Sequence, residues 1–447
     1  MQETIEKIEA MLVLKQYSNL RAFLCEMNEA DIAQIFAEMS DEKIPILFRL
    51  LPKDVAAETF SMMDTDQQGL LIKGFSDSEI KEVFDELYVD DAADIVEEMP
   101  ANVVKRILKN TDPKTRRMIN EILKYPEDSA GSLMNTEYIS LRPNMTVEEA
   151  IKRIRRVISD AETVYTCFVT KDDRKLLGLI SIKTLLLSNK DERIKDIMDN
   201  TDVYVHTHDD KEDVAKAVNK YDLVTIPVVD DEMRLVGIVT FDDAIDVMQE
   251  ETTEDIEMMA AIAPHEESYF KMSDIHHARN RIIWLLVLML SAAITGHIIA
   301  NYEAAFATEA ILVSFIPMLM GTGGNCGSQS ATLIIRGMSV DDIKLRDFFK
   351  VLWKELRVSA LMSAVLGAVN AIRIIIQYHD YTLALVVSLS IIGTVVMSQL
   401  IGCMLPMLAK RLKMDPAVMA APLITTIVDA GSIIIYFSIA TKFFNIG

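Results

Sequence analysis

An acidic side chain lies within a long apolar segment near the end of the sequence. Asp429 follows the run Pro422-Leu-Ile-Thr-Thr-Ile-Val, so Thr425 and Thr426 precede it by four and three residues. In a helix this spacing places the three side chains on one face. Two hydroxyls beside a carboxylate supply the hard oxygen ligands that a hydrated Mg²⁺ ion prefers. The alternative is a structural aspartate paired with Arg373 or with a backbone amide.

A glycine-rich polar stretch interrupts a second apolar segment. Residues 321–330 read Gly-Thr-Gly-Gly-Asn-Cys-Gly-Ser-Gln-Ser, which combines four glycines with several amide and hydroxyl groups. At membrane depth such a backbone is tolerated where it packs closely on another helix or lines a watery path. Both readings, a pore lining and plain helix packing, remain open from the sequence.

The five apolar segments that would hold these residues cover 282–301, 308–335, 358–378, 382–409 and 417–441. Each is long enough to span a bilayer, which takes about 20 apolar residues. Lys and Arg precede the first segment and fill the connections after the second and the fourth, whereas the two opposite loops contain none. The positive-inside rule therefore predicts a multi-pass protein of the cytoplasmic membrane, with its N-terminus in the cytoplasm and its C-terminus outside.

Acidic residues are concentrated in the first part of the chain. The net charge is −22, but residues 276–447 hold 13 Lys and Arg against 9 Asp and Glu, a charge of +4, which leaves −26 for residues 1–275. Such a field repels nucleic acid and attracts cations. We therefore expect divalent cations as partners and no nucleic acid. Acidity that serves solubility alone is the alternative.

The first 125 residues show a helical repeat. Short amphipathic stretches succeed one another, as expected for helices stacked into a superhelix that buries one stripe of each. Each stretch closes on a large apolar residue, and these recur every twelve positions, as Met39, Leu51, Met63, Phe75, Leu87 and Met99.

Residues 128–255 instead show two α/β repeats of about sixty residues. Strands are predicted at 165–170 and 177–182 in the first copy and at 223–229 and 236–241 in the second. This order resembles a tandem pair of CBS (cystathionine-β-synthase type) modules, most specifically in the segment from Gly237 to Asp243. The resemblance implies that Thr240 and Asp243 hold the ribose and phosphate of an adenine nucleotide such as ATP. An acidic helix over residues 244–263 follows, and Pro264 is expected to end it.

The features that indicate a family are the acidic helical repeat, the paired modules, the acidic helix, the five spans and the motifs GTGGNCGSQSATLIIR and TTIVDAG. With these features, the whole chain resembles the MgtE magnesium-transporter family. The expected fold is a multidomain membrane protein with an all-α helical-repeat N-domain, an α/β tandem CBS pair, a connecting (plug) helix and a five-helix transmembrane domain. The expected domains are residues 1–127, 128–197, 198–247, 248–275 and 276–447.

The resemblance also implies a homodimer in the lipid bilayer, with a pore between the two membrane domains. Asp429 from each subunit would bind hydrated Mg²⁺ there, and Asn325 and Ser328 would help to line the path. Family regulatory carboxylates map onto acidic residues of the first part of the chain. These are Asp91 and Asp94 in the helical repeat, Asp210, Glu212 and Asp222 in the second module, Asp243 and Asp246 where the connecting helix begins, and Glu254 and Asp255 along it.

The expected function is Mg²⁺ uptake through a channel or transporter that Mg²⁺ itself closes. Acidic sensor halves repel one another unless cations bridge them, so Mg²⁺ bound at millimolar sites would hold the sensor closed. A membrane-anchored signalling or scaffold protein whose CBS pair senses nucleotide is the main alternative. An enzyme is not expected, because the histidines are dispersed and no nucleophile adjoins a base.

Overall fold

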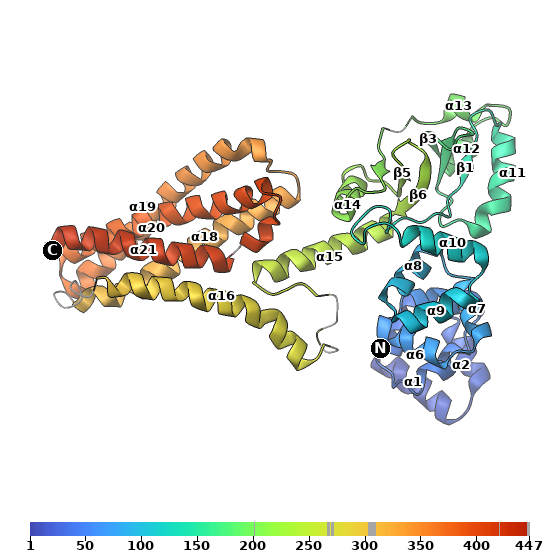
Figure 1. Cartoon of the computed structure of the whole chain (residues 1–447), viewed down its shortest axis with the longest axis horizontal. Coiled ribbons are helices and arrows are strands. Elements are labelled where there is room, and N and C mark those ends of the chain that lie inside the picture. The colour runs from blue at the N-terminus through green and yellow to red at the C-terminus, as the bar shows by residue number, and fades with distance from the viewer. Residues whose placement is uncertain (201, 266–268, 270–271, 303–309, 420, 445–447) are drawn as a thin grey trace. The chain divides into compact units, whose positions relative to one another are not determined.

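The computed structural model describes residues 1–200, 202–265, 269, 272–302, 310–419 and 421–444. The chain divides into two compact units, Met1–Met248 and Gln249–Gly447. Along the chain, short helices come first, two small sheets follow, and long helices form the second unit (Figure 1). The five domain boundaries expected from the sequence stay a prediction.

Ten short helices form the first half of the first unit, and the predicted helical repeat is confirmed. All six apolar residues of the twelve-residue period lie within three residues of the end of one of the helices α3 to α8, and all six are buried. The helices are α1 (Gln2–Val13), α2 (Tyr17–Leu24), α3 (Glu29–Ala37), α4 (Ile44–Phe48), α5 (Lys53–Ser61), α6 (Thr65–Gly74), α7 (Asp77–Phe84), α8 (Val89–Glu98), α9 (Ala101–Asn110) and α10 (Pro113–Ile122).

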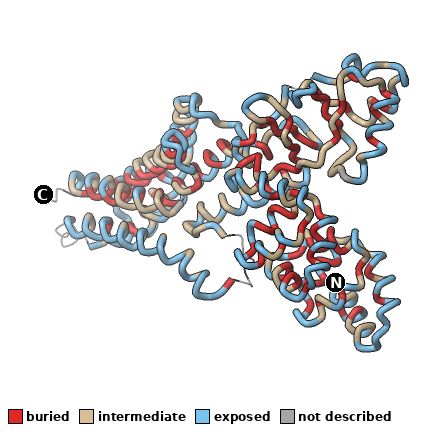
Figure 2. The backbone as a smooth tube through the Cα atoms, turned by 45° about the vertical axis from the view of Figure 1, so that its right-hand side comes forward, coloured by how far each residue is buried: buried red, intermediate tan, exposed pale blue. Residues whose placement is uncertain are grey.

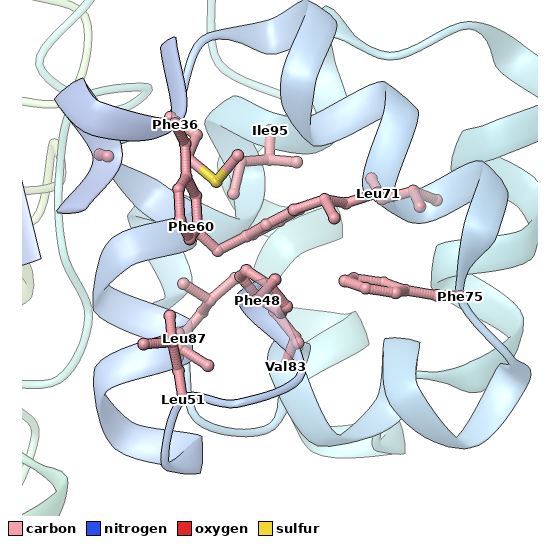
Figure 3. Packing of buried hydrophobic residues seen from close by; sticks show 14 of the residues in the cluster. Phe36, Phe48, Leu51, Phe60, Leu71, Phe75, Val83, Leu87 and Ile95 are labelled. Atoms are coloured by element: carbon pink, nitrogen blue, oxygen red, sulfur yellow. The ribbon is translucent and has the colours of Figure 1, made fainter. Parts of the chain in front are cut away.

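Aromatic rings from successive helices meet in the core of this half (Figure 3). Phe48 contacts Phe75 at a centroid distance of 5.4 Å and Phe60 edge-on at 6.0 Å. Edge-on and offset arrangements are the favourable ones for aromatic pairs. This core fixes the place of α8, which carries two of the predicted acidic residues, Asp91 and Asp94.

Two three-stranded sheets form the second half of the first unit. Their orders are β1-β2-β3 and β4-β5-β6, and in each the first strand is parallel and the third antiparallel to the middle one. The strands are β1 (Ser140–Leu141), β2 (Thr166–Thr170), β3 (Leu176–Ser181), β4 (Val205–His206), β5 (Thr225–Val229) and β6 (Leu235–Thr240). The helices are α11 (Val147–Val157), α12 (Ile182–Leu187), α13 (Ile194–Ile197) and α14 (Lys211–Lys220).

The two sheets repeat each other residue by residue, which confirms the predicted internal duplication. Phe168 pairs with Leu179, and Pro227 pairs with Ile238, each 59 positions further along. Both middle strands shift register at the equivalent place, after Val169 and after Val228. All four predicted strands are present within two residues of their expected bounds.

The connecting helix α15 (Phe241–Met259) follows directly on the last strand. Its predicted range was 244–263, but the helix ends before Pro264, and Ala261 takes a left-handed backbone with φ of 56°. Residues 266–268 and 270–271 of the predicted linker lie outside the described residues.

Among the described residues, five helices are long and apolar enough to cross a membrane, as predicted. They are α16 (Asp274–Ala300), α18 (Ile316–Ser339), which follows the 3₁₀ turn Ala310–Phe315, α19 (Phe348–Tyr378), α20 (Tyr381–Arg411) and α21 (Ala421–Phe444). The third helix begins ten residues before its predicted start at 358. The predicted start of the second segment, at 308, lies outside the described residues. Burial differs strongly among the five, and α16 is exposed along nearly all its length (Figure 2).

Glycines let α18 approach α20 and α21 backbone to backbone. A Cβ added at Gly402 of α20 would clash with the carbonyl oxygen of Gly327 of α18. A Cβ added at Gly323 would lie 2.7 Å from a methyl group of Thr394 and 2.8 Å from one of Val428. Small residues serve this purpose in membrane helices, where close van der Waals contact drives association.

We therefore expect Gly402→Ala to lower the thermal midpoint of the full-length protein in detergent. The added methyl group meets backbone, which cannot yield as a flexible side chain does, and overpacking of this kind costs about 1–3 kcal/mol. Gly296→Ala in α16 is the matched control, because a Cβ there has nothing within 4 Å. Equal midpoints for the two variants would contradict the close approach of α18 and α20.

Candidate functional site

The intramembrane carboxylate Asp429 lies half-buried in α21. Thr425 and Thr426 lie about one turn before it on the same helix. Their hydroxyls donate to the Pro422 carbonyl oxygen at 2.9 and 3.0 Å. Each hydroxyl oxygen keeps lone pairs that can still accept a hydrogen bond or bind a cation. The predicted oxygen face of the helix is therefore present.

No partner neutralises the Asp429 carboxylate within the described part of the chain, where it forms neither a hydrogen bond nor an ion pair. Arg373, the alternative partner, instead approaches the Met318 sulfur at 3.5 Å and the Phe315 ring at 6.0 Å. An ionisable side chain at membrane depth is costly and marks a functional site by default. The structural alternative for Asp429 is thus not supported.

The glycine stretch of α18 packs beside this face of α21. A Cβ at Gly324 would lie 3.0 Å from the Thr425 methyl group, so the two helices touch one turn from Asp429. Asn325, the next residue, is exposed, and Ser328 is half-buried. Neither side chain forms a hydrogen bond within the described residues, so both are available to line a polar path along α18.

A second set of carboxylates, the acidic cluster, gathers in the first unit. It joins three elements that are far apart in the sequence: the start of α8, two loops of the first CBS module, and the start of α15. We define it as Asp90, Asp91, Asp94, Glu137, Glu162, Asp242, Asp243 and Asp246, which are linked by the contacts and electrostatic interactions below.

One buried amide joins two carboxylates of the acidic cluster. The Asn135 Nδ2 donates to Asp90 Oδ1 at 3.0 Å and to Glu162 Oε2 at 2.9 Å. The Val89 backbone N–H donates to Glu137 Oε2 at 3.3 Å. These bonds bring the loops of the CBS module against the first turn of α8.

Burial and mutual repulsion make the ionised state of the acidic cluster unfavourable. Loss of solvent raises the pKa of Asp91 to about 6 and that of Asp94 to about 7, and neighbouring carboxylates add to both shifts. The pKa of Glu162 rises to about 8, again by burial first and then by Asp243 and Asp91. Burial likewise raises the pKa of Asp90 and of Asp243.

Protons or bound cations can offset this charge at neutral pH, because basic side chains do not. Within the described residues, Asp91, Asp94 and Glu162 form no salt bridge with Lys, Arg or His. Buried charges without partners are strongly destabilising, and hard divalent cations are the natural counterions of clustered carboxylates. In the part of the chain that the structure describes, no three His, Cys, Asp or Glu side chains converge as ready metal ligands. The cluster therefore fits hydrated, loosely held ions better than a tightly coordinated one.

The other predicted regulatory residues lie apart from the cluster. Asp210 caps the start of α14, where its Oδ1 accepts from the Glu212 N–H at 2.9 Å, and Glu212 pairs with Lys216 at 2.6 Å. Asp222 lies exposed beyond the other end of this ten-residue helix, about 15 Å away at 1.5 Å per residue. Glu254 and Asp255 belong to the part of α15 in the second unit. Of the nine, the interactions given among the described residues bring together Asp91, Asp94, Asp243 and Asp246.

The predicted nucleotide residues adjoin the same place. Thr240 is buried at the end of β6, and its hydroxyl and N–H both donate to the Asp243 carboxylate, the latter at 3.3 Å. This pair caps α15. Asp243 is thus both a member of the acidic cluster and the neighbour of Thr240, so a nucleotide and a cation would share one carboxylate.

Four members of the acidic cluster were not among the predicted site residues. Asp90 and Asp242 adjoin predicted residues, and their place in the run of acids was the available signal. Glu137 and Glu162 lie in loops of the first CBS module, where no periodicity or motif marks them. Only the packing of this module on α8 brings them to the site.

Comparisons with known proteins agree with this architecture. A family model described as "Divalent cation transporter" matches residues 316–439, one for the MgtE intracellular N domain matches 27–128, and one for the CBS domain matches 130–189 and 194–250. The chain is 36% identical over 425 residues to the magnesium transporter MgtE of Thermus thermophilus, covering 94% of each chain. It is 30% identical over 443 residues to that of Bacillus subtilis, covering 99% of this chain and 98% of the relative.

Two solved structures resemble the first unit. One is the cytosolic domain of the Mg²⁺ channel MgtE in complex with ATP, with a TM-score of 0.52 and 36% identity over 54% of this chain and 99% of that one. The other is the soluble part of a magnesium transporter, with a TM-score of 0.53 and 28% identity over 56% of this chain and 99% of that one. Fold and site together define a membrane transporter of divalent cations with a cytosolic regulatory part. The chain belongs to the MgtE family.

The raised pKa values predict how the stability of the first unit depends on pH without divalent ions. The folded unit binds protons at the acidic cluster more tightly than the unfolded chain, whose carboxyl groups titrate near 3.8 to 4.5. The contribution of the cluster to the free energy of unfolding is therefore fully present below about pH 4 and is lost as pH rises through the folded pKa values of about 6 to 8.

Thermal unfolding of a fragment of residues 1–248 in chelator, followed by circular dichroism, checks this dependence. Related cytosolic parts were solved on their own, which supports the use of the fragment. Added Mg²⁺ should raise the midpoint much more at pH 8 than at pH 5. A midpoint that rises with pH in chelator would show that the cluster does not carry this repulsion.

Proposed function

We propose that the chain is a Mg²⁺ channel that mediates Mg²⁺ uptake across the cytoplasmic membrane and is closed by Mg²⁺ bound to its cytosolic part. The ion path runs past the Asp429 face of α21 and the glycine stretch of α18. The sensor is the acidic cluster. Flow is driven by the membrane potential, which contributes about 2.3 kcal/mol per unit charge per 100 mV, and thus about twice that for a divalent ion.

The observation that carries this proposal is the reach of α15. Its first turn supplies Asp242 and Asp243 to the acidic cluster in the first unit. At its other end, in the second unit, Met258 and Met259 pack on an apolar cluster that includes Ile424, the residue before Thr425. One continuous helix therefore leads from the sensor carboxylates to the turn of α21 that precedes the pore carboxylate.

The switch follows from the electrostatics of the cluster. When cytosolic Mg²⁺ is high, bound ions offset the repulsion and hold α15 against the CBS module and α8. When Mg²⁺ falls, the carboxylates repel one another, the start of α15 is released, and its other end no longer confines α18 and α21. This is a population shift that needs only a difference in ion affinity between the two states.

The working unit is a homodimer in the bilayer, as the family resemblance implies. Asp429 is only half-buried in the single chain, and one carboxylate with two hydroxyls supplies too few ligands for an octahedral ion, even one that keeps several waters. A second copy would double the set. The basic residues between the spans favour an N-terminus in the cytoplasm and a C-terminus outside.

ATP is the proposed further ligand of the CBS pair, at Thr240 and Asp243. Its support is the paired hydroxyl and carboxylate of this capped turn, together with the related cytosolic domain solved in complex with ATP. Because Asp243 also belongs to the acidic cluster, we expect ATP and Mg²⁺ to affect each other's affinity. Equilibrium dialysis of labelled ATP at several Mg²⁺ concentrations measures this coupling.

Uptake of Mg²⁺ into proteoliposomes that hold the purified full-length protein tests the proposal. A Mg²⁺-sensitive dye inside the vesicles should report flux well above that of protein-free vesicles. If the protein binds ATP but the vesicles show no flux under any condition, the result would instead favour a membrane-anchored signalling or scaffold protein.

A further inference from the structure

The first turns of α19 carry basic side chains on one exposed face. Lys350, Lys354 and Arg357 follow one another at intervals of four and three residues, a spacing that places them on the same side of a helix. All three are exposed, and Arg346 is exposed in the short 3₁₀ turn just before the helix. We call these four residues the basic stripe.

Few carboxylates in the described part of the chain offset the charge of the basic stripe. Lys350 pairs with Asp347 at 2.9 Å. Lys354 and Arg357 form no salt bridge with any described Asp or Glu, and Glu355, which lies between them in the sequence, is buried on the packed side of the helix. An exposed group of charges of one sign attracts a partner of the opposite sign. The stripe therefore fits an anionic partner.

The length of α19 places the basic stripe at the surface of the bilayer. The helix has 31 residues and is therefore about 46 Å long, whereas the hydrocarbon core of a bilayer is about 30 Å thick and takes about 20 residues. Residues 358–378 are sufficient to cross that core. Residues 348–357 then extend into the headgroup layer, where lipid phosphate groups lie.

Two large aromatic side chains adjoin the basic stripe. Phe349 is 80% exposed and Trp353 is 60% exposed, and each directly precedes a lysine of the stripe. Tryptophan is enriched where headgroups meet acyl chains, because one part of its ring system is apolar and the other is polar. Basic and aromatic side chains together match the phosphate and the upper acyl chain of a phospholipid, whereas a soluble anion would leave the aromatic rings in water.

The other face of the same turns packs on helices of the proposed ion path. Val351 and Leu352 pack on an apolar cluster formed by α18 and α20. One turn further along α19, Glu355 Oε2 accepts a hydrogen bond from the Ser330 hydroxyl at 2.8 Å. Ser330 ends the glycine stretch of α18, so a partner that holds the start of α19 also supports that stretch.

We propose that the basic stripe binds the headgroups of anionic phospholipids in the leaflet where α19 begins, and that the bound lipid supports the ion path by holding α19 against α18. In the proposed orientation this is the cytoplasmic leaflet. The lipid site itself does not depend on the proposed channel function, whereas its effect on the ion path does.

The fluorescence of Trp353 measures which lipid lies beside the basic stripe. The chain has two tryptophans, so Trp284→Phe leaves Trp353 as the single reporter. This full-length variant is placed in phosphatidylcholine vesicles that contain a small fraction of brominated phosphatidylglycerol, or the same fraction of brominated phosphatidylcholine, because bromine quenches tryptophan on contact. We expect much stronger quenching by the phosphatidylglycerol. Equal quenching by both lipids, or quenching by neither because protein covers the stripe, would overturn the proposal.

Two double variants in the same background separate the stripe from overall charge. Lys354→Gln/Arg357→Gln should lower the preference for phosphatidylglycerol roughly 25-fold, since each basic side chain near an anionic surface changes affinity about fivefold. Arg279→Gln/Arg281→Gln, at the start of α16, removes two exposed charges on the same predicted side of the membrane and should keep the preference. An equal fall in both double variants would show that net charge, and not the stripe, selects the lipid.

Mg²⁺ uptake by the same two double variants tests the effect on the ion path. In vesicles that contain phosphatidylglycerol, Lys354→Gln/Arg357→Gln should take up Mg²⁺ more slowly than Arg279→Gln/Arg281→Gln, and in pure phosphatidylcholine the two should match. Lipid charge also concentrates Mg²⁺ at the surface, but it does so alike for both variants. Equal uptake in both kinds of vesicle would overturn the support of the ion path by lipid. Selective quenching of Trp353 without flux in any variant would instead contradict the channel and leave the lipid site supported.

Discussion

Asp429→Ala is expected to abolish Mg²⁺ uptake by the reconstituted protein. The carboxylate has no partner among the described residues, so its charge is free to attract a cation at membrane depth, and the two hydroxyls beside it cannot replace that charge. Loss of one charged partner from a buried ionic site costs about 3–5 kcal/mol, which corresponds to a decrease of at least about a hundredfold. Asp429→Asn should fail almost as completely, because it keeps the shape and loses the charge.

The matched controls lie on the same helix. Thr426→Val removes an oxygen from the Asp429 face and should reduce uptake by a smaller factor than the loss of the carboxylate. Thr441→Val removes a hydroxyl that likewise donates to its own helix, at the Phe437 carbonyl, but lies three turns away. Its uptake should match that of wild type. Full uptake by Asp429→Ala would show that the Asp429 carboxylate is not required in the ion path.

Neutralising the acidic cluster is the second change with a large expected effect. The double variant Asp91→Asn/Asp243→Asn should need at least about ten times more Mg²⁺ to suppress uptake, because it removes two carboxylates that face one another across α8 and α15. Without Mg²⁺ the variant should be more resistant to proteolysis than wild type, because buried repulsion is relieved. Adding Mg²⁺ should then increase its resistance only slightly.

The control for this variant makes the same change of charge elsewhere. Asp172 and Asp173 are exposed in the turn between β2 and β3. The double variant Asp172→Asn/Asp173→Asn should respond to Mg²⁺ as wild type does. Equal loss of the Mg²⁺ response in both double variants would mean that overall charge, and not the acidic cluster, governs closure.

Local patterns in the sequence were sufficient for the elements, and they marked Asp429 as a candidate site residue. The twelve-residue period predicted the helices because each period buries one large side chain, and Met39 and Met99 are both buried as expected. The duplicated strands were visible because short runs rich in β-branched residues favour strands. Asp429 stood out because an acid within an apolar span is costly and by default marks a functional site.

Features that depend on tertiary contact were not predictable in the same way. Glu137 and Glu162 reach the acidic cluster only because loops of the CBS module pack on α8. Glu355 lies outside the predicted third span, 358–378, whereas α19 begins at Phe348 and buries Glu355. One residue of a helix can be buried while its neighbours are exposed, and a count of charges in a window does not show this.

The measurement that tests the central claim most directly is the Mg²⁺ current through membrane patches that contain the wild-type protein, while Mg²⁺ is stepped on the cytosolic face. If cytosolic Mg²⁺ closes the channel, the current should fall as cytosolic-side Mg²⁺ rises into the millimolar range and recover when Mg²⁺ is withdrawn. A current that stays constant, or that grows with cytosolic-side Mg²⁺, would contradict closure by the ion that the channel conducts.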